Sequence, residues 1–142
     1  MNQTIENFGY PASLVKEYTH WVILLRPQQA TLGALILACK EDVLDFGKVS
    51  AQAHSEMKQI TSELETCLKK CFGYQKINYM MLMMVDPDVH FHVLPRYAQP
   101  QEFEGVRFED PGWPVLPNLG HAAQVNDNCR TALLARLKEN WA

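Results

Sequence analysis

An alternation of polar and apolar residues that begins at residue 88 constrains the fold of this chain more than any other feature. It reads Asp88-Val89-His90-Phe91-His92-Val93 and follows the turn-forming pair Asp86-Pro87. Alternate side chains of a β-strand point to opposite faces, so the pattern predicts a strand with one apolar and one polar face. Side chains on one face start ~7 Å apart, a spacing that brackets one phosphate group or one metal ion. We interpret the polar face as functional; the alternative is a solvent-facing edge strand.

Three further segments have the composition of β-strands. The β-branched and aromatic run from Trp21 to Leu25 predicts a strand, and the apolar run from Leu32 to Cys39 predicts an antiparallel partner for it. The segment 77–85 is apolar enough for a strand covered on both faces. We expect it to form a tight hairpin with a strand over 89–97, in which Pro95 marks an edge or an end.

Helical spacing occurs at three places. Ser13 precedes residues that fit a capped helical turn. From Ser50 to Gly73, apolar residues recur every three or four positions and predict an amphipathic helix. A repeat every four residues from Val125 to Trp141 predicts a C-terminal helix, whereas residues 98–120 are rich in Pro and Gly and predict an ordered loop.

Length and composition limit the class of protein. The chain has 142 residues, 47% of them hydrophobic, and we expect residues 1–142 to form a single α+β domain with an antiparallel sheet. The 13 basic and 16 acidic residues give a net charge of −3, which argues against nucleic-acid binding and leaves a small anionic ligand open.

Location and redox state follow from what the chain lacks. No apolar run reaches the ~20 residues that span a bilayer, and the N-terminus lacks the pattern of a secretory signal. We therefore expect no membrane association and a cytoplasmic location. The four cysteines are then thiols, and we interpret Cys67 and Cys71, four positions apart in the predicted helix, as structural residues without a metal.

The segment Asp88 to Arg96 resembles the signature of the histidine triad family, in which three histidines alternate with apolar residues. The resemblance extends upstream to Lys76-Ile77-Asn78 and to the predicted hairpin at 26–37. Downstream, Asp110-Pro111-Gly112-Trp113-Pro114 is similar to a Trp-Pro segment of a bacterial branch, which resembles diadenosine polyphosphate hydrolases. The match covers residues 20–115 and implies a histidine triad-like fold: an antiparallel sheet, a long amphipathic helix and a C-terminal helix.

The resemblance implies an enzyme that attacks the α-phosphorus of a nucleotide, forms a nucleotidyl-histidine and passes the group to water or another acceptor. His90 matches the nucleophile, whose second ring nitrogen is held by a backbone carbonyl, and His92 matches the histidine that contacts the phosphate. Asn78 matches a nucleotide-site position, while Arg96 and Trp113 are further candidates for substrate binding. An ordinary imidazole, with a pKa of ~6.5, is mostly neutral at pH 7, so such a nucleophile needs orientation more than activation. The resemblance also implies a homodimer, with the 50–72 helix and the strand edges as candidate surfaces, and no cofactor.

The chain departs from the family at several positions. Asp88 replaces the first histidine; because an ionised carboxylate repels a polyphosphate, we expect it to accept a hydrogen bond from a ring N–H or a leaving-group proton. The glycine-rich phosphate loop is reduced to Asp86-Pro87, Arg26 replaces an acidic ribose contact, and Ala34 replaces a frequent histidine. The substrate therefore stays open among dinucleoside polyphosphates, nucleoside phosphoramidates and adenylated sugars.

Other functions fit parts of the same pattern. An altered triad could bind a nucleotide without turnover, and Asp88, His90 and His92 could hold a catalytic metal with an open position for water. A purely structural or adaptor protein is a third alternative. The pairs Met80-Met81 and Met83-Met84 could form an adaptable binding surface, but we favour a strand buried on both faces.

Overall fold

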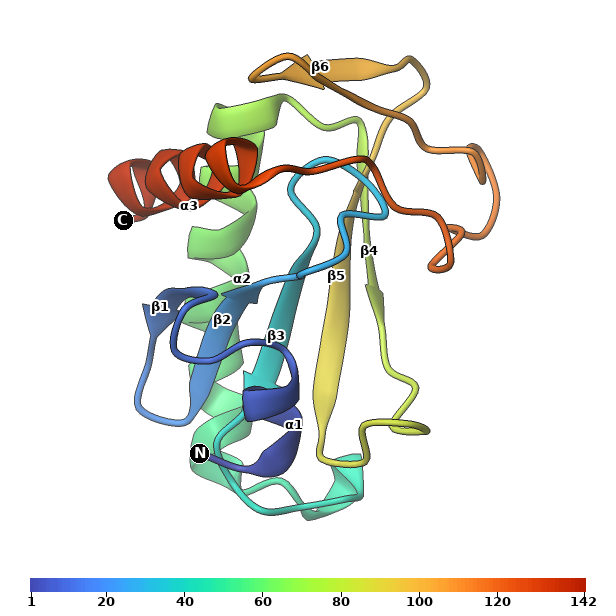
Figure 1. The fold of residues 1–142 in the computed structure, drawn as a ribbon. Coiled ribbons are helices and arrows are strands. Elements are labelled where there is room, and N and C mark those ends of the chain that lie inside the picture. Colours follow the sequence, from blue (N-terminus) through green and yellow to red (C-terminus); the bar gives the residue numbers. More distant parts are fainter.

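The computed structural model describes residues 1–142 as an α+β fold around one five-stranded antiparallel sheet (Figure 1). The strand order is β1-β2-β3-β5-β4. The strands are β1 (Leu14–Glu17), β2 (Trp21–Leu25), β3 (Leu35–Cys39), β4 (Lys76–Met80) and β5 (His90–Arg96). The predicted fold class is confirmed. No helix combines the length and the apolar character needed to cross a membrane.

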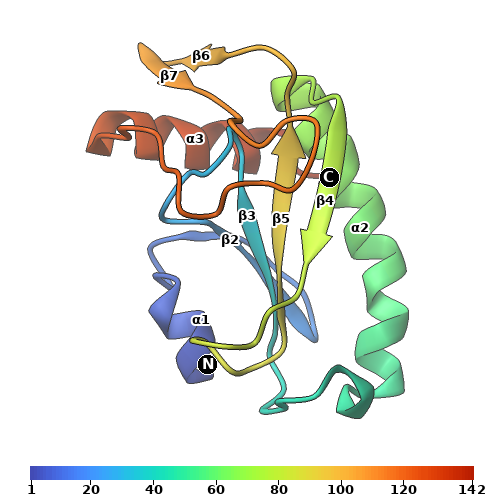
Figure 2. The same cartoon turned by 90° about the vertical axis from the view of Figure 1, so that its right-hand side faces the viewer.

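The long helix α2 (Ala51–Phe72) covers one face of the sheet, as the side view in Figure 2 shows. Ser50 caps its start by accepting a hydrogen bond from the amide of Ala53, and Gly73 ends it in the left-handed conformation with φ of 63°. The apolar stripe of the helix packs into the main core. The amphipathic helix predicted between Ser50 and Gly73 is confirmed.

Strands β2 and β3 form the predicted antiparallel hairpin, with Trp21 opposite Cys39 and Leu25 opposite Leu35. Every residue of both strands is buried, because other elements cover the sheet on both faces here. The turn between the strands needs a glycine at position 33, where φ is 85° and a Cβ atom would lie 2.8 Å from the ring of Phe72.

The two histidines lie on the sheet face opposite α2. Strand β5 runs between β3 and β4, and its Phe91 and Val93 join the core under α2, so His90 and His92 face the other way. The short helix α1 (Gln3–Asn7) and the long connection before the last helix lie over this second face (Figure 2). Beyond Val93, β5 pairs only with β4, so the predicted edge position of Pro95 is confirmed.

The C-terminal third adds a small hairpin and a helix. Strands β6 (Gln101–Phe103) and β7 (Val106–Phe108) form a separate two-stranded sheet inside the segment that we predicted as a loop. A single 3-10 turn, η1 (Phe46–Lys48), precedes α2. Helix α3 (Asp127–Asn140) confirms the predicted C-terminal helix, and the side chain of Asn126 caps it.

The helical turn predicted after Ser13 is wrong, because these residues form β1 and pair with β2. Ser13 does not cap a helix; its hydroxyl donates to the carbonyl of Phe8 at 2.7 Å. The helix at this end is α1, which begins after Asn2.

The prediction of a strand over 77–85 that is covered on both faces is wrong in two respects: only residues up to Met80 form a strand, and no residue of that strand is fully buried. Strand β4 ends at Met80 and forms one edge of the sheet, and residues 81–89 make a longer connection than the tight hairpin that we expected. Met83 has a positive φ of 46°, which breaks the extended conformation. Met84 and Val85 are 82% and 93% exposed, so the interpretation of the methionine pairs as core residues fails for this segment.

Candidate functional site

His90 and His92 lie next to each other on β5, with ring centroids 5.2 Å apart in an edge-to-face arrangement. They are 2% and 7% exposed. Phe8, which follows α1, packs against both rings at centroid distances of 5.4 Å and 5.9 Å. These burial values exclude the alternative that the histidines are solvent-facing residues of an edge strand.

His90 is oriented by the main chain. Its Nδ1 atom lies 2.7 Å from the carbonyl oxygen of Asp88. A carbonyl oxygen can only accept, so the neutral ring carries its proton on Nδ1. The Nε2 atom is left with a free lone pair, which is the form that a histidine nucleophile needs.

His92 holds the opposite tautomer because its partner is a donor. Arg26 donates from Nε to the Nδ1 atom of His92 at 3.2 Å, and a guanidinium has no acceptor, so the proton of the neutral ring is on Nε2. Burial lowers the pKa of His92 to about 4, with Arg26 and His90 acting in the same direction and Asp86 against them. At pH 7, His92 is therefore a neutral hydrogen-bond donor beside the Nε2 atom of His90.

The side chain of Asp88 is directed to the N-terminal helix. Its Oδ2 atom accepts from the hydroxyl of Thr4 at 2.9 Å and from the amide of the same residue at 3.4 Å. The main-chain amide of Asp88 donates to the same hydroxyl at 3.1 Å. The hydrogen bond to a ring N–H that we expected from the carboxylate is thus made by the carbonyl oxygen of Asp88.

A cavity of about 220 Å³ opens in front of the histidines. Its walls come from the residue that follows α1, the residue that follows β2, the connection between β4 and β5, and the loop before α3. The lining residues are Phe8, Arg26, Leu82, Met83, Met84, Val85, Asp86, His90, His92 and Leu119. Exposed apolar side chains therefore surround a polar floor, so the alternative of an adaptable surface describes the 82–85 segment better than a core strand does.

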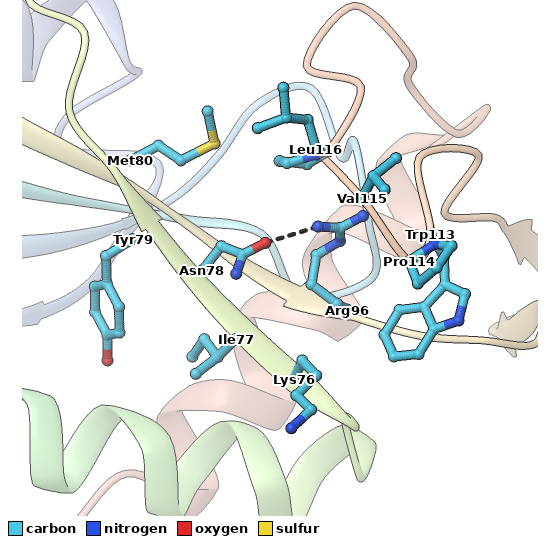
Figure 3. Close-up of a pocket in the computed structure, with 11 residues that line it drawn as sticks. Lys76, Ile77, Asn78, Tyr79, Met80, Arg96, Trp113, Pro114, Val115 and Leu116 are labelled. Atoms are coloured by element: carbon cyan, nitrogen blue, oxygen red, sulfur yellow. Dashed lines mark hydrogen bonds between the residues drawn. The ribbon is translucent and has the colours of Figure 1, made fainter.

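The three predicted substrate-binding residues line a second cavity, of about 780 Å³, on the β4 edge of the same sheet face (Figure 3). Arg96 is held by Asp110 through Nε at 2.6 Å and Nη2 at 3.0 Å, and its Nη1 atom donates to Asn78 at 2.7 Å. The side chains of Arg96 and Asp110 are 5% and 1% exposed. Arg96 thus anchors the loop that carries Trp113, and it forms a structural ion pair.

Two residues that contact the histidines were not predicted as site residues. Phe8 lies outside the segment 20–115 over which the sequence resembles a family, and nothing in its surroundings pointed to a site. At Arg26 the sequence shows only a departure from the family pattern. A signal was present, because an arginine at the end of a continuously apolar strand must find a polar partner.

No protein-family model matches this chain, and no curated protein sequence matches it either. The solved structures give clear matches. A histidine triad protein from Sinorhizobium meliloti 1021 superposes with a TM-score of 0.76 over 99% of this chain and 95% of its own, at 21% identity. The chain has the histidine triad fold.

Two more solved structures with the histidine triad fold also match this chain. A hypothetical histidine triad nucleotide-binding protein from Sulfolobus tokodaii has a TM-score of 0.70 at 13% identity, covering 96% of this chain and 88% of that chain. A zinc-bound histidine triad family protein from Mycobacterium smegmatis has a TM-score of 0.64 at 14% identity, covering 95% and 90%. At these identities the likeness concerns the fold.

The predicted metal alternative finds no geometric support in this chain. No three side chains of His, Cys, Asp or Glu come together in a way that could hold a metal ion. The carboxylate of Asp88 is occupied by Thr4. All four cysteines are free; Cys67 is buried and Cys71 half-buried, with their Sγ atoms 3.9 Å apart.

Proposed function

We propose that this protein is a nucleotide hydrolase or nucleotidyl transferase that cleaves at the α-phosphate through a covalent nucleotidyl-His90 intermediate. One observation carries the proposal: the adjacent rings of His90 and His92 have opposite partners at Nδ1, a carbonyl acceptor for His90 and a guanidinium donor for His92, and these partners favour opposite tautomers. One presents a lone pair and the other presents an N–H, and both border the same cavity. Transfer of a nucleotidyl group through a covalent intermediate requires at least a nucleophile and a nearby hydrogen-bond donor for the phosphoryl oxygens.

The first step forms a bond between the Nε2 atom of His90 and the α-phosphorus while the bond to the leaving group breaks. The leaving phosphate departs with the bonding electrons, and the ring becomes an N-phosphorylated imidazolium. Its Nδ1–H still donates to the carbonyl of Asp88, which stabilises the positive charge. His92 donates from Nε2 to a non-bridging oxygen, where negative charge accumulates.

The second step returns the enzyme to its starting form. Water attacks the phosphorus, the bond to His90 breaks, and the electron pair returns to Nε2. The proton of the water goes to solvent, and a nucleoside monophosphate leaves. An acceptor other than water gives a transferase by the same route.

The substrate we favour is a dinucleoside polyphosphate or a related nucleotide conjugate. Support comes from the two cavities on one sheet face, one at the histidines and one at Asn78, Arg96 and Trp113. A substrate with two bulky ends would place one end in each cavity. The amide nitrogen of Asn78 has no protein partner and is free to donate to it, and Trp113 offers a half-buried ring for stacking.

The test is the release of nucleoside monophosphate from a panel of diadenosine polyphosphates and nucleoside phosphoramidates, with and without a chelator. We expect turnover that survives chelation, that is lost in His90→Ala, and that is kept in His54→Ala, which changes an exposed histidine of α2. Turnover lost on chelation would instead favour a metal enzyme. Tight nucleotide binding without turnover in the wild-type protein would favour a protein that binds nucleotides and does not cleave them.

We also propose that the protein forms a homodimer through β4. This strand is one of the two edges of the sheet, β1 being the other, and its backbone donors and acceptors on the outer side have no partner strand. Light scattering on the protein as it elutes from a size-exclusion column measures the oligomeric state. A monomer at micromolar concentration would contradict the proposed homodimer. The cytoplasmic location stays a prediction.

A further inference from the structure

Arg26 is a buried cation without an acidic partner. The residue is 8% exposed, and no carboxylate lies within ion-pair distance of it. Its Nε atom donates to His92 at 3.2 Å and its Nη1 atom to the carbonyl of Gln28 at 2.6 Å. The Nη2 atom has no hydrogen-bond partner in the protein, and the side chain lines the histidine cavity.

The sheet is built so that this side chain crosses from β2 to β5. Strand β3 lies between them, and neighbouring strands are ~4.8 Å apart, so the side chain spans about two strand spacings. At the level of Arg26, the neighbouring residue is Ala34, which directly precedes β3 and whose carbonyl accepts from the amide of Arg26 at 3.0 Å. A methyl group leaves the space above β3 open for the arginine.

The turn that follows Arg26 is fixed by the buried side chain of Gln29. Its amide nitrogen donates to the carbonyl of Arg26 at 2.8 Å and to that of Ala34 at 2.9 Å, while its oxygen accepts from Gly33 at 3.0 Å. Arg130 of α3 donates to the carbonyl of Pro27 at 2.8 Å. The arginine is therefore held at a fixed place in the cavity.

The charges in the cavity leave Arg26 uncompensated. A guanidinium stays ionised at neutral pH, and moving it out of water costs free energy unless an anion is near. Arg96, the other buried arginine, has Asp110 as its counter-ion. The one carboxylate among the cavity residues is Asp86, whose Oδ1 atom accepts from Asn7 at 3.0 Å and which forms no ion pair with Arg26.

We infer that Arg26 is an anion subsite of this cavity, binding a non-bridging oxygen of the reacting phosphate through Nη2 while its Nε atom keeps His92 as an Nε2–H donor. The inference rests on the proposed function and deepens it. The phosphate then has the lone pair of His90 in front and two donors, His92 and Arg26, at its oxygens. Arg26 neutralises charge that would repel the nucleophile and stabilises the charge of the transition state. Arg26 stands where the family has an acidic ribose contact, and it thus binds the phosphate of the ligand and not the ribose.

Binding measurements on proteins without turnover test this assignment. The affinities for AMP, adenosine and inorganic phosphate are measured by calorimetry for wild type, Arg26→Met and Arg26→Lys. The matched control is Arg107→Met, which removes an exposed arginine paired with Glu109. We expect Arg26→Met to weaken AMP binding roughly 10- to 100-fold, the effect of losing one charged hydrogen bond, and to leave adenosine binding unchanged. Arg26→Lys keeps part of the AMP affinity because it keeps the charge.

Nitrogen-15 NMR of the histidine rings measures the tautomer of His92. This tautomer would not change if Arg26 had only a structural role. In ligand-free wild type we expect His92 to be protonated on Nε2, and in Arg26→Met we expect the ring to lose this single tautomer, while His90 stays protonated on Nδ1. A thermal melt shows whether each variant is folded. Arg26→Lys serves as the second variant if the methionine variant is unfolded.

Three results would overturn the inference: equal loss of AMP and adenosine affinity, which would indicate a ribose contact; unchanged AMP affinity in Arg26→Met; and no binding of AMP or phosphate by the wild type. The proposed function fails separately, when the wild type binds AMP through Arg26 and still cleaves no substrate.

Discussion

The ring of His90 and the main chain of Asp88 are joined by a hydrogen bond of 2.7 Å between Nδ1 and the carbonyl oxygen. Every residue at position 88 offers this carbonyl, so the orientation of the nucleophile does not depend on which side chain stands there. The carboxylate is free for another role and holds Thr4 of α1. Position 88 therefore orients His90 with its backbone and anchors the N-terminal helix with its side chain.

The anchor predicts that Asp88→Ala and Thr4→Val destabilise the protein by similar amounts, about 1–3 kcal/mol, because each removes a hydrogen bond to a charged or buried partner. In the double variant, the loss of unfolding free energy should be smaller than the sum of the two single losses, since both changes remove the same contact. Urea denaturation measures the free energies of unfolding. A loss of turnover in Asp88→Ala at unchanged stability would instead place the carboxylate in the chemistry.

His92 predicts a specific acid sensitivity. Its pKa is lowered from 6.5 to about 4 in the folded protein. At a pH between these two values, the unfolded chain therefore binds a proton that the folded protein does not bind. The free energy of unfolding should fall by on the order of 3 kcal/mol as the pH drops from 6.5 to 4 and should gain nothing from this group above pH 6.5.

Denaturation of the wild type and of His92→Gln across this pH range checks the prediction. The variant should lose this part of the acid sensitivity, whereas His54→Gln, at an exposed position, should keep it. Parallel pH curves for the wild type and His92→Gln would show that His92 titrates normally.

The fold could be predicted largely because its long elements follow simple periods. The helix from Ser50 to Gly73 shows the 3.6-residue period and both caps, and the strand at His90 shows the two-residue period. The predictions failed for short elements, whose secondary structure is decided by tertiary contacts. Ser13 looks like a helix cap, but pairing with β2 makes the next residues a strand.

The histidine cavity was predictable only along β5, where His90 and His92 are two positions apart. Phe8 and Arg26 reach the histidines from α1 and β2, and such contacts depend on strand order, which no local pattern encodes. The apolar run after Met80 was mistaken for core because composition does not distinguish a buried strand from the apolar rim of a cavity.

The buried pair of Arg96 and Asp110 predicts a large effect from a small change. Asp110→Asn leaves the guanidinium buried without a counter-ion and should cost about 3–5 kcal/mol. The control Glu109→Gln breaks an exposed pair with Arg107 and should cost less than about 1 kcal/mol. Equal stabilities of the two variants in urea would contradict the structural role of Arg96.

Asp86 predicts a gain of affinity. Its carboxylate lines the histidine cavity and repels a bound phosphate, so Asp86→Asn should tighten AMP binding roughly two- to tenfold. The asparagine oxygen can still accept from Asn7, so the local structure is kept. Calorimetry at low and high salt checks this, and weaker binding in the variant would show that the carboxylate takes part in holding the ligand.

The covalent His90 intermediate is tested most directly by the stereochemical course at phosphorus, measured on a chiral α-phosphorothioate analogue of the best substrate in water labelled with oxygen-18, so that the product phosphorus stays chiral. Each in-line displacement inverts the phosphorus, and the account requires two displacements, one by His90 and one by water. It therefore predicts overall retention of configuration. Inversion would show that water attacks the phosphorus directly and would contradict a covalent intermediate on His90.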